Sequence, residues 1–239
     1  MNHSNSFIQV FLLLLLIVVG PVVDLVATRG LKQRPDSAKK LRYYKIGIAS
    51  QWLCAALACR AVGWDALFHL NAGSRDARWL LGHKPIAIAV AMLLAVIFLY
   101  NFRPAVKCLR TGVISSGVAK YLRSLSFFLP VTPAERRWFT VLCVTAGVCE
   151  EILCRGFLFY SIHVWPFQLG LTAALFLSAM VFGFNHLYQG LGGVVNTSIA
   201  GVLFGLLFLL SGNLALPMVL HAAIDLQVLI LLKRLPAAK

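Results

Sequence analysis

Long apolar runs constrain this chain more than any other feature of its sequence. Seven stretches are each long enough to cross the hydrocarbon core of a bilayer as an α-helix. They lie near residues 7–28, 44–60, 85–102, 138–162, 168–190, 192–211 and 214–232. Hydrophobic residues make up 60% of the 239 residues, which is far above the share in soluble domains. We therefore predict an all-α fold, a polytopic membrane helix bundle of about seven transmembrane helices.

Two further segments bear on the number of spans. The stretch from Gly112 to Pro130 carries Lys120 and Arg123, which predicts an amphipathic helix at the membrane surface or a short eighth span. The first apolar run has no Lys or Arg before it, whereas a cleaved signal peptide begins with a basic region. The first run is therefore predicted to be a retained membrane anchor.

Basic residues are concentrated in three segments. Residues 29–45, residues 103–137 and the chain after Leu232 hold 17 of the 22 Lys and Arg, and the net charge is +14. Alternating spans place all three segments on one face, which the positive-inside rule identifies as cytoplasmic. We expect a multi-pass protein of the cell membrane with its N-terminus outside and its C-terminus inside. Because no aromatic-basic module accompanies the charge, we expect the lipid bilayer and no nucleic acid as partner.

Ionisable residues inside the last four runs mark a candidate site, because such side chains are costly in hydrocarbon. They are Glu150, Glu151, Arg155, His186, His221 and Asp225. Glu151 and Arg155 are spaced i, i+4, so they can neutralise each other and support the helix packing. Glu150 points about 100° away around the helix and has no cation nearby in sequence. It is the candidate general base.

Each histidine has a neighbour one helical turn away. Phe182 precedes His186 and Asp225 follows His221, and an aspartate at that spacing can fix the orientation and tautomer of an imidazole.

The predicted helices place the two histidines at different depths. His186 lies near the cytoplasmic end of its run, whereas His221 lies roughly 8 to 10 Å inside the opposite end of its own. A common site requires unequal helix lengths, tilt, or a break at Gly190–Gly193 or Pro217.

The ordered motifs Glu-Glu-x-x-x-Arg, Phe-x-x-x-His and His-x-x-x-Asp, between residues 138 and 232, resemble the CPBP family of CAAX proteases and bacteriocin-processing proteins. The resemblance extends to the Ras-converting CAAX prenyl protease and implies a glutamic-type intramembrane endopeptidase. In that mechanism Glu150 and His186 activate a water, and His221 and Asp225 stabilise the oxyanion. The family often has Asn at the last position, and an ionised Asp225 would repel an oxyanion. Asp225 is then either protonated or serves mainly to orient His221.

The chain divides into three parts on this interpretation. Residues 1–137 form N-terminal transmembrane helices with basic cytoplasmic loops, residues 138–232 form the catalytic bundle, and residues 233–239 form a basic cytoplasmic tail. The expected substrate is a membrane-associated protein or peptide. A lipidated C-terminus, a membrane-anchored tail and a bacteriocin-type leader all satisfy the requirement for an extended peptide in a membrane cavity.

Two other functions use the same residues. Glu150, His186 and His221 could bind zinc with an open position for water, although no His-Glu-x-x-His motif is present. The glutamic mechanism needs no cofactor. The polar cluster could also belong to a non-catalytic membrane binding or transport protein.

Overall fold

The computed structural model describes residues 3–33, 36–69 and 82–235, and these ranges are almost entirely helical. The described residues contain no β-strand, only an isolated bridge between His69 and Asn213. In chain order the elements are α1 (His3–Leu14), the π-helix η1 (Leu15–Val19), α2 (Gly20–Gln33), α3 (Ser37–Val62), α4 (Trp64–Phe68), α6 (Lys84–Asn101), α7 (Arg103–Thr111), α8 (Ser116–Ser124), α9 (Pro133–Glu151), the π-helix η2 (Ile152–Leu158), α10 (Phe159–His163), α11 (Leu171–Phe184), the 3₁₀-helix η3 (Leu187–Gln189), α12 (Leu191–Ser211) and α13 (Ala215–Leu232). The predicted all-α bundle is confirmed.

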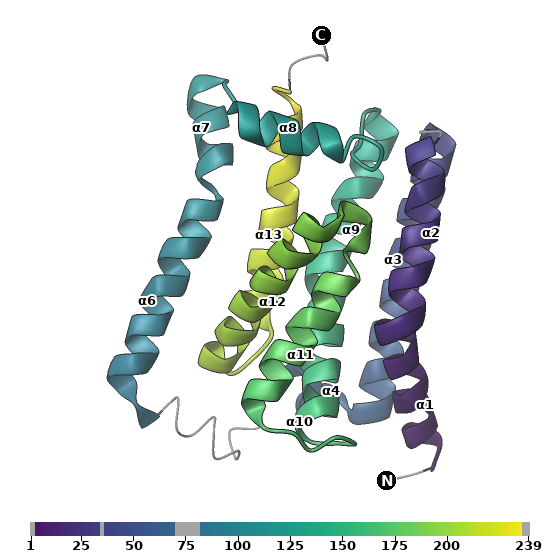
Figure 1. The fold of residues 1–239 in the computed structure, drawn as a ribbon, viewed down its shortest axis with the longest axis vertical. Coiled ribbons are helices and arrows are strands. Elements are labelled where there is room, and N and C mark those ends of the chain that lie inside the picture. The colour runs from purple at the N-terminus through teal and green to yellow at the C-terminus, as the bar shows by residue number, and fades with distance from the viewer. Residues whose placement is uncertain (1–2, 34–35, 70–81, 236–239) are drawn as a thin grey trace.

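Six of the seven predicted apolar runs fall on a helix or on helices that continue directly into one another, and the fifth falls on α11 and the turn after it. The first run lies on α1–η1–α2 and the fourth on α9–η2–α10. The described segments that are long and apolar enough to cross a membrane by themselves are Asn5–Gln33, Lys84–Thr111, Leu191–Ser211 and Ala215–Leu232. The helices α3, α9–η2–α10 and α11 are shorter or more polar. In the middle of the bundle α9 packs against both α3 and α13, while α3 lies beside α1 and α2 at one edge (Figure 1).

The segment from Gly112 to Pro130 contains α8, which lies across one end of the bundle (Figure 1). At nine residues it is too short to span a bilayer. Its buried side includes Ala119 and Leu122, while Lys120 and Arg123 are exposed. The amphipathic surface helix is therefore the predicted alternative that the structure adopts.

The described basic segments gather at one end of the bundle. The C-terminal ends of α2, α7 and α13 lie there together with α8, whereas α6 begins at the opposite end (Figure 1). The alternation of the predicted spans likewise places the three basic segments at one end of the bundle. Arg75, Arg78 and residues 236–239 of the basic tail lie outside the described residues.

A buried cluster of hydrogen bonds fixes the beginning of α9. The Thr132 hydroxyl accepts from the Glu135 N–H, and the Glu135 carboxylate accepts from the Val131 N–H at 2.7 Å. Lys40 lies 4.0 Å from that carboxylate. Burial would raise the pKa of Glu135, but hydrogen bonds from Ser37 and Val131 and the charge of Lys40 hold it below its ordinary value. This capping box sets where α9 starts, and hence the depth at which its last residues lie.

Glycine allows two close helix contacts at the centre of the bundle. A Cβ added at Gly147 on α9 would lie 2.6 Å from the Ala222 nitrogen on α13. A Cβ added at Gly201 on α12 would lie 2.9 Å from the Ala179 Cα on α11. Membrane helices pack closely through small residues of this kind.

The Gly147 contact predicts a loss of stability on adding one methyl group. Gly147→Ala forces α9 and α13 apart, and we expect it to lower the free energy of unfolding by about 1–3 kcal/mol. Gly117→Ala on α8 is the matched control, because its Cβ would meet nothing within 4 Å. Thermal unfolding of both variants in detergent measures the difference. Equal melting temperatures would contradict the close approach of α9 and α13.

Candidate active site

The three predicted motifs meet in one polar cluster between α9, α11 and α13. Glu151 Oε1 accepts hydrogen bonds from Arg155 Nη1 at 2.9 Å and from His221 Nδ1 at 2.8 Å. The Phe182 ring contacts both imidazoles, with ring centroids 4.8 Å from His186 and 5.8 Å from His221. The residues that the sequence spreads over three helices therefore share one depth.

A short α11 brings the two histidines together. The run predicted over residues 168–190 was too long, because the helix covers only Leu171–Phe184. The chain then turns and α12 begins after Gly190, whose φ of +81° is a conformation that favours glycine. Unequal helix length and the break near Gly190 are thus the predicted alternatives that occur. Pro217 causes no break, since it lies in the first turn of α13, where proline is tolerated.

The Glu151–Arg155 pair is enclosed on all sides. Its side chains are 0% and 1% exposed. The Arg155 guanidinium lies over the Phe182 ring at 4.5 Å and over the Phe204 ring at 5.4 Å, and Nη2 donates to the Gly201 carbonyl at 3.2 Å. Arg155 belongs to the π-helix η2, which directly follows the two glutamates. The geometry agrees with the scaffold role expected for this pair.

Glu151 holds the His221 ring, and Asp225 does not make the hydrogen bond that would orient it. Asp225 Oδ2 lies 3.7 Å from His221 Nε2, beyond hydrogen-bonding distance, while Nδ1 donates to Glu151. The reason is that Glu151 faces the ring from the neighbouring helix. The Phe204 ring also stacks on His221 with centroids 5.1 Å apart. Asp225 instead lies beside the nitrogen that faces Glu150.

Glu150 has one satisfied and one unsatisfied oxygen. Its Oε1 accepts from Gln51 Nε2 on α3 at 3.1 Å. Its Oε2 is buried, has no hydrogen-bond partner among the described residues and lies 3.9 Å from His221 Nε2. Buried polar atoms are rarely left without a partner, so this oxygen is a free acceptor of the cluster, as are Glu151 Oε2 and Gln51 Oε1, and of the three it is the one that lies next to His221 Nε2.

His186 is held by its own helix. Its Nδ1 lies 2.8 Å from the Phe182 carbonyl, which can only accept, so Nδ1 carries the proton of that hydrogen bond. The Nε2 atom is left for other contacts. Within the described chain no hydrogen bond or ion pair joins His186 to Glu150, with which the family resemblance implies that it activates a water.

The N-terminal helices contribute residues that the sequence motifs did not identify. The Tyr43 hydroxyl of α3 donates to Asp24 Oδ1 of α2. Asp24 lies close enough to interact electrostatically with His186 and Glu150. The signal in the sequence is an acidic residue inside an apolar run. In the structure Asp24 lies beside the cluster.

The turn that carries His186 is attached to the first helix. Asn185 Nδ2 donates to the Leu16 carbonyl at 3.1 Å, and Lys32 Nζ donates to the Tyr188 carbonyl at 2.7 Å. Leu16 lies in the π-helix η1, and π-helices leave backbone groups free for such contacts and often occur at functional sites. The α1–η1–α2 helix thus fixes the position of the turn.

Among the described residues, no group of three or more His, Cys, Asp or Glu is arranged to hold a metal ion. The zinc ligand set proposed from the sequence, Glu150, His186 and His221, stays a prediction. Cys149 and Cys154, which flank the two glutamates, are free thiols buried in the apolar core.

The family comparison covers the part of the chain that forms this cluster. Residues 133–227 match the family described as type II CAAX prenyl endopeptidase Rce1-like. The match begins with α9, ends within α13 and includes all three motifs, although it covers less than half of the chain. It confirms the resemblance to the CAAX proteases and indicates a membrane endopeptidase. No curated protein and no solved structure matches the chain.

The buried pair predicts a rescue experiment. Arg155→Met leaves the Glu151 carboxylate without its cation, and breaking a buried pair in this way costs roughly 3–5 kcal/mol of unfolding free energy. Adding Glu151→Gln removes the stranded charge and keeps an oxygen that can accept from His221 Nδ1. We expect the double variant to regain much of the lost stability in thermal unfolding. Additive losses would show that the two side chains do not act as a pair.

Proposed function

We propose that this chain is an integral membrane endopeptidase that cuts a membrane-associated protein, with Glu150 as the general base. The observation that carries the proposal is the unsatisfied, buried Oε2 atom of Glu150. It faces His221 Nε2 across 3.9 Å. A polar contact longer than about 3.5 Å leaves room for a bridging oxygen, and hydrolysis needs a water there.

In this mechanism Glu150 and His186 activate the water. The Glu150 carboxylate takes a proton from the water, and the resulting hydroxide attacks the carbonyl carbon of the peptide bond. The proton is then delivered to the leaving nitrogen. Because His186 Nδ1 is engaged with the Phe182 carbonyl, its Nε2 is the atom that would contact the water or the leaving nitrogen.

In this mechanism His221 stabilises the oxyanion, and Asp225 lies beside it. The bond from Nδ1 to Glu151 fixes the ring, and a protonated His221 directs an Nε2–H into the space near Glu150 Oε2 and Asp225 Oδ2. A fixed donor aimed at developing negative charge is an effective catalytic device. An ionised Asp225 would balance the imidazolium, and a protonated Asp225 would itself donate to the oxyanion.

The substrate class follows from the site and the family together. The cluster lies among transmembrane helices, so the scissile bond must reach it in extended form. The family description names a prenyl endopeptidase, which favours a protein with a lipidated C-terminus over a bacteriocin-type leader. With the basic end of the bundle in the cytoplasm, such a substrate would approach from that side.

Loss of the general base predicts loss of cleavage. We expect Glu150→Gln and His186→Ala each to lower turnover of a farnesylated C-terminal peptide by about 10²–10⁴-fold, while chelator leaves the wild type unchanged. Asp65→Asn is the matched control, because Asp65 is 96% exposed at the end of the bundle. Purified proteins in detergent, assayed by mass spectrometry of the products, give the comparison.

Each other outcome of that assay contradicts part of the proposal. Cleavage that chelator abolishes and zinc restores would favour a metalloprotease. Equal residual cleavage in all samples would indicate a contaminant and leave a binding or transport role.

The attachment of the His186 turn predicts a second effect on activity. Asn185→Ala removes the bond to the Leu16 carbonyl, so His186 is less well placed, and we expect turnover to fall about 10-fold to 100-fold with a smaller change in KM. Asn196→Ala is the control, since Asn196 is exposed on α12. Equal turnover of the Asn185 variant and the wild type would contradict the role of the first helix.

A further inference from the structure

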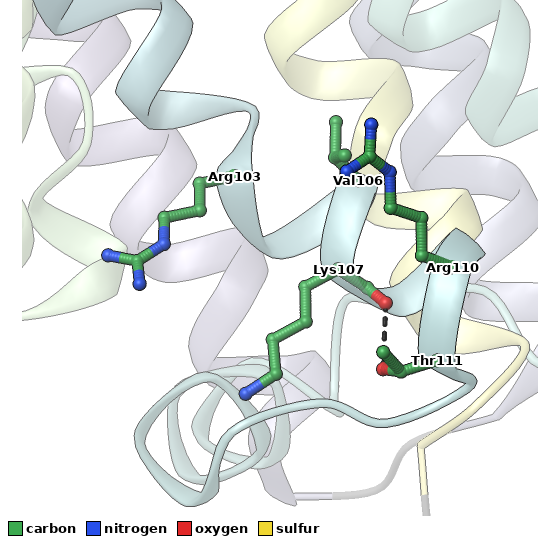
Figure 2. Close-up of a pocket in the computed structure, with 5 residues that line it drawn as sticks. All are labelled: Arg103, Val106, Lys107, Arg110 and Thr111. Atoms are coloured by element: carbon green, nitrogen blue, oxygen red, sulfur yellow. Dashed lines mark hydrogen bonds between the residues drawn. The ribbon is translucent and has the colours of Figure 1, made fainter.

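The outer face of α7 carries basic side chains that have no acidic partner among the described residues. Arg103, Lys107 and Arg110 line a shallow pocket of about 300 Å³ together with Val106 and Thr111 (Figure 2). These positions follow the i, i+3, i+4 spacing, which places them on one side of the helix.

The opposite side of α7 is fixed to the bundle. Ala105 and Cys108 are buried, and the Cys108 thiol contacts the Ile230 carbonyl of α13 at 3.8 Å. The basic face is therefore held in place and is not an unsupported surface helix.

The charge of this face is not compensated by the protein. No Asp or Glu occurs between Asp76 and Glu135, and no ion pair joins Arg103, Lys107 or Arg110 to an acidic residue in the described part of the chain. The Arg103 guanidinium lies over the face of an aromatic ring, 5.6 Å from the Tyr100 centroid. The pocket thus offers guanidinium and ammonium groups to an anion.

The surroundings of the pocket are apolar and face outward. Tyr100 is 67% exposed and Leu109 is 69% exposed, and exposed apolar residues such as Val96 and Leu99 continue along α6. Since α6–α7 is one of the segments that can cross a membrane, acyl chains would lie against these side chains. An aromatic residue next to basic residues at the end of a span is typical of the headgroup level.

We infer that the α7 face is a binding site for the headgroup of an anionic phospholipid. Arginine forms paired hydrogen bonds to phosphate oxygens and lysine adds a point charge, while the acyl chains extend along α6. The apolar wall distinguishes this occupant from a free phosphate or a nucleic acid. The inference does not depend on the proposed protease activity.

Titration of fluorescent phosphatidylglycerol into the purified chain in detergent tests the inference. From the usual contribution of a basic residue near an anionic membrane surface, the triple variant Arg103→Gln, Lys107→Gln, Arg110→Gln should bind about 100-fold more weakly. The control variant Arg29→Gln, Lys39→Gln, Arg42→Gln removes equal charge from exposed positions at the same end of the bundle. It should bind as the wild type does, and fluorescent phosphatidylcholine should bind weakly to all three proteins.

Three results would overturn the inference. Equal weakening by both triple variants would mean that only the net charge matters. Equal binding of phosphatidylcholine and phosphatidylglycerol would mean that the site does not distinguish an anionic headgroup from a zwitterionic one. Displacement of the lipid by millimolar inorganic phosphate would identify a site for free phosphate. Unchanged thermal unfolding of the variants would show that the comparison is between folded proteins.

Discussion

The buried carboxylate of Glu151 is the interaction on which the candidate site depends. A single oxygen accepts from both Arg155 and His221, so one group joins η2 to α13. Without its cation this carboxylate would be costly in an apolar interior. The Phe182 and Phe204 rings enclose the cation and contact His221 as well. The Glu151–Arg155 pair that joins the helices therefore also orients the His221 imidazole. A change at Glu151 or at Arg155 is thus expected to alter the placement of His221.

Sequence reasoning identified the helices and the residues of the cluster because both follow from local spacing. The apolar runs predict helices in the right places, and the i, i+4 spacing predicts the Glu151–Arg155 pair. The partner of His221 could not be predicted in this way. Glu151 and Asp225 are both acidic residues that could reach the ring, and only the packing of α9 on α13 decides between them. The end of α11 at Phe184 was also missed, because the predicted run was extended through Asn185, His186 and Gln189, which interrupt the apolar sequence directly after the helix.

The contribution of the N-terminal half was the largest feature missed. Residues 1–137 carry no catalytic motif, yet α2 and α3 supply Asp24, Tyr43 and Gln51 to the cluster. The contact between Asn185 and Leu16 uses a backbone carbonyl, which has no signature in a sequence. Each of the two π-helices lies next to the site, one before Gly20 and one after Glu151, as is common near functional sites. The family match covers the three sequence motifs, but the cluster also includes residues of α2 and α3, which lie outside the match.

The balance of charges in the cluster bears on how it could handle protons. Asp24, Glu150, Glu151 and Asp225 are four carboxyl groups, while Arg155 is the one permanent cation that pairs with them in the described contacts. Several uncompensated charges cannot share a region of low dielectric, so protons must be distributed among the remaining carboxyls, His186 and His221. Groups this close titrate together, and the proton count belongs to the set. In the proposed mechanism, a water proton accepted by Glu150 is then balanced by a change at a neighbour, as peptide hydrolysis requires when base and acid act in succession.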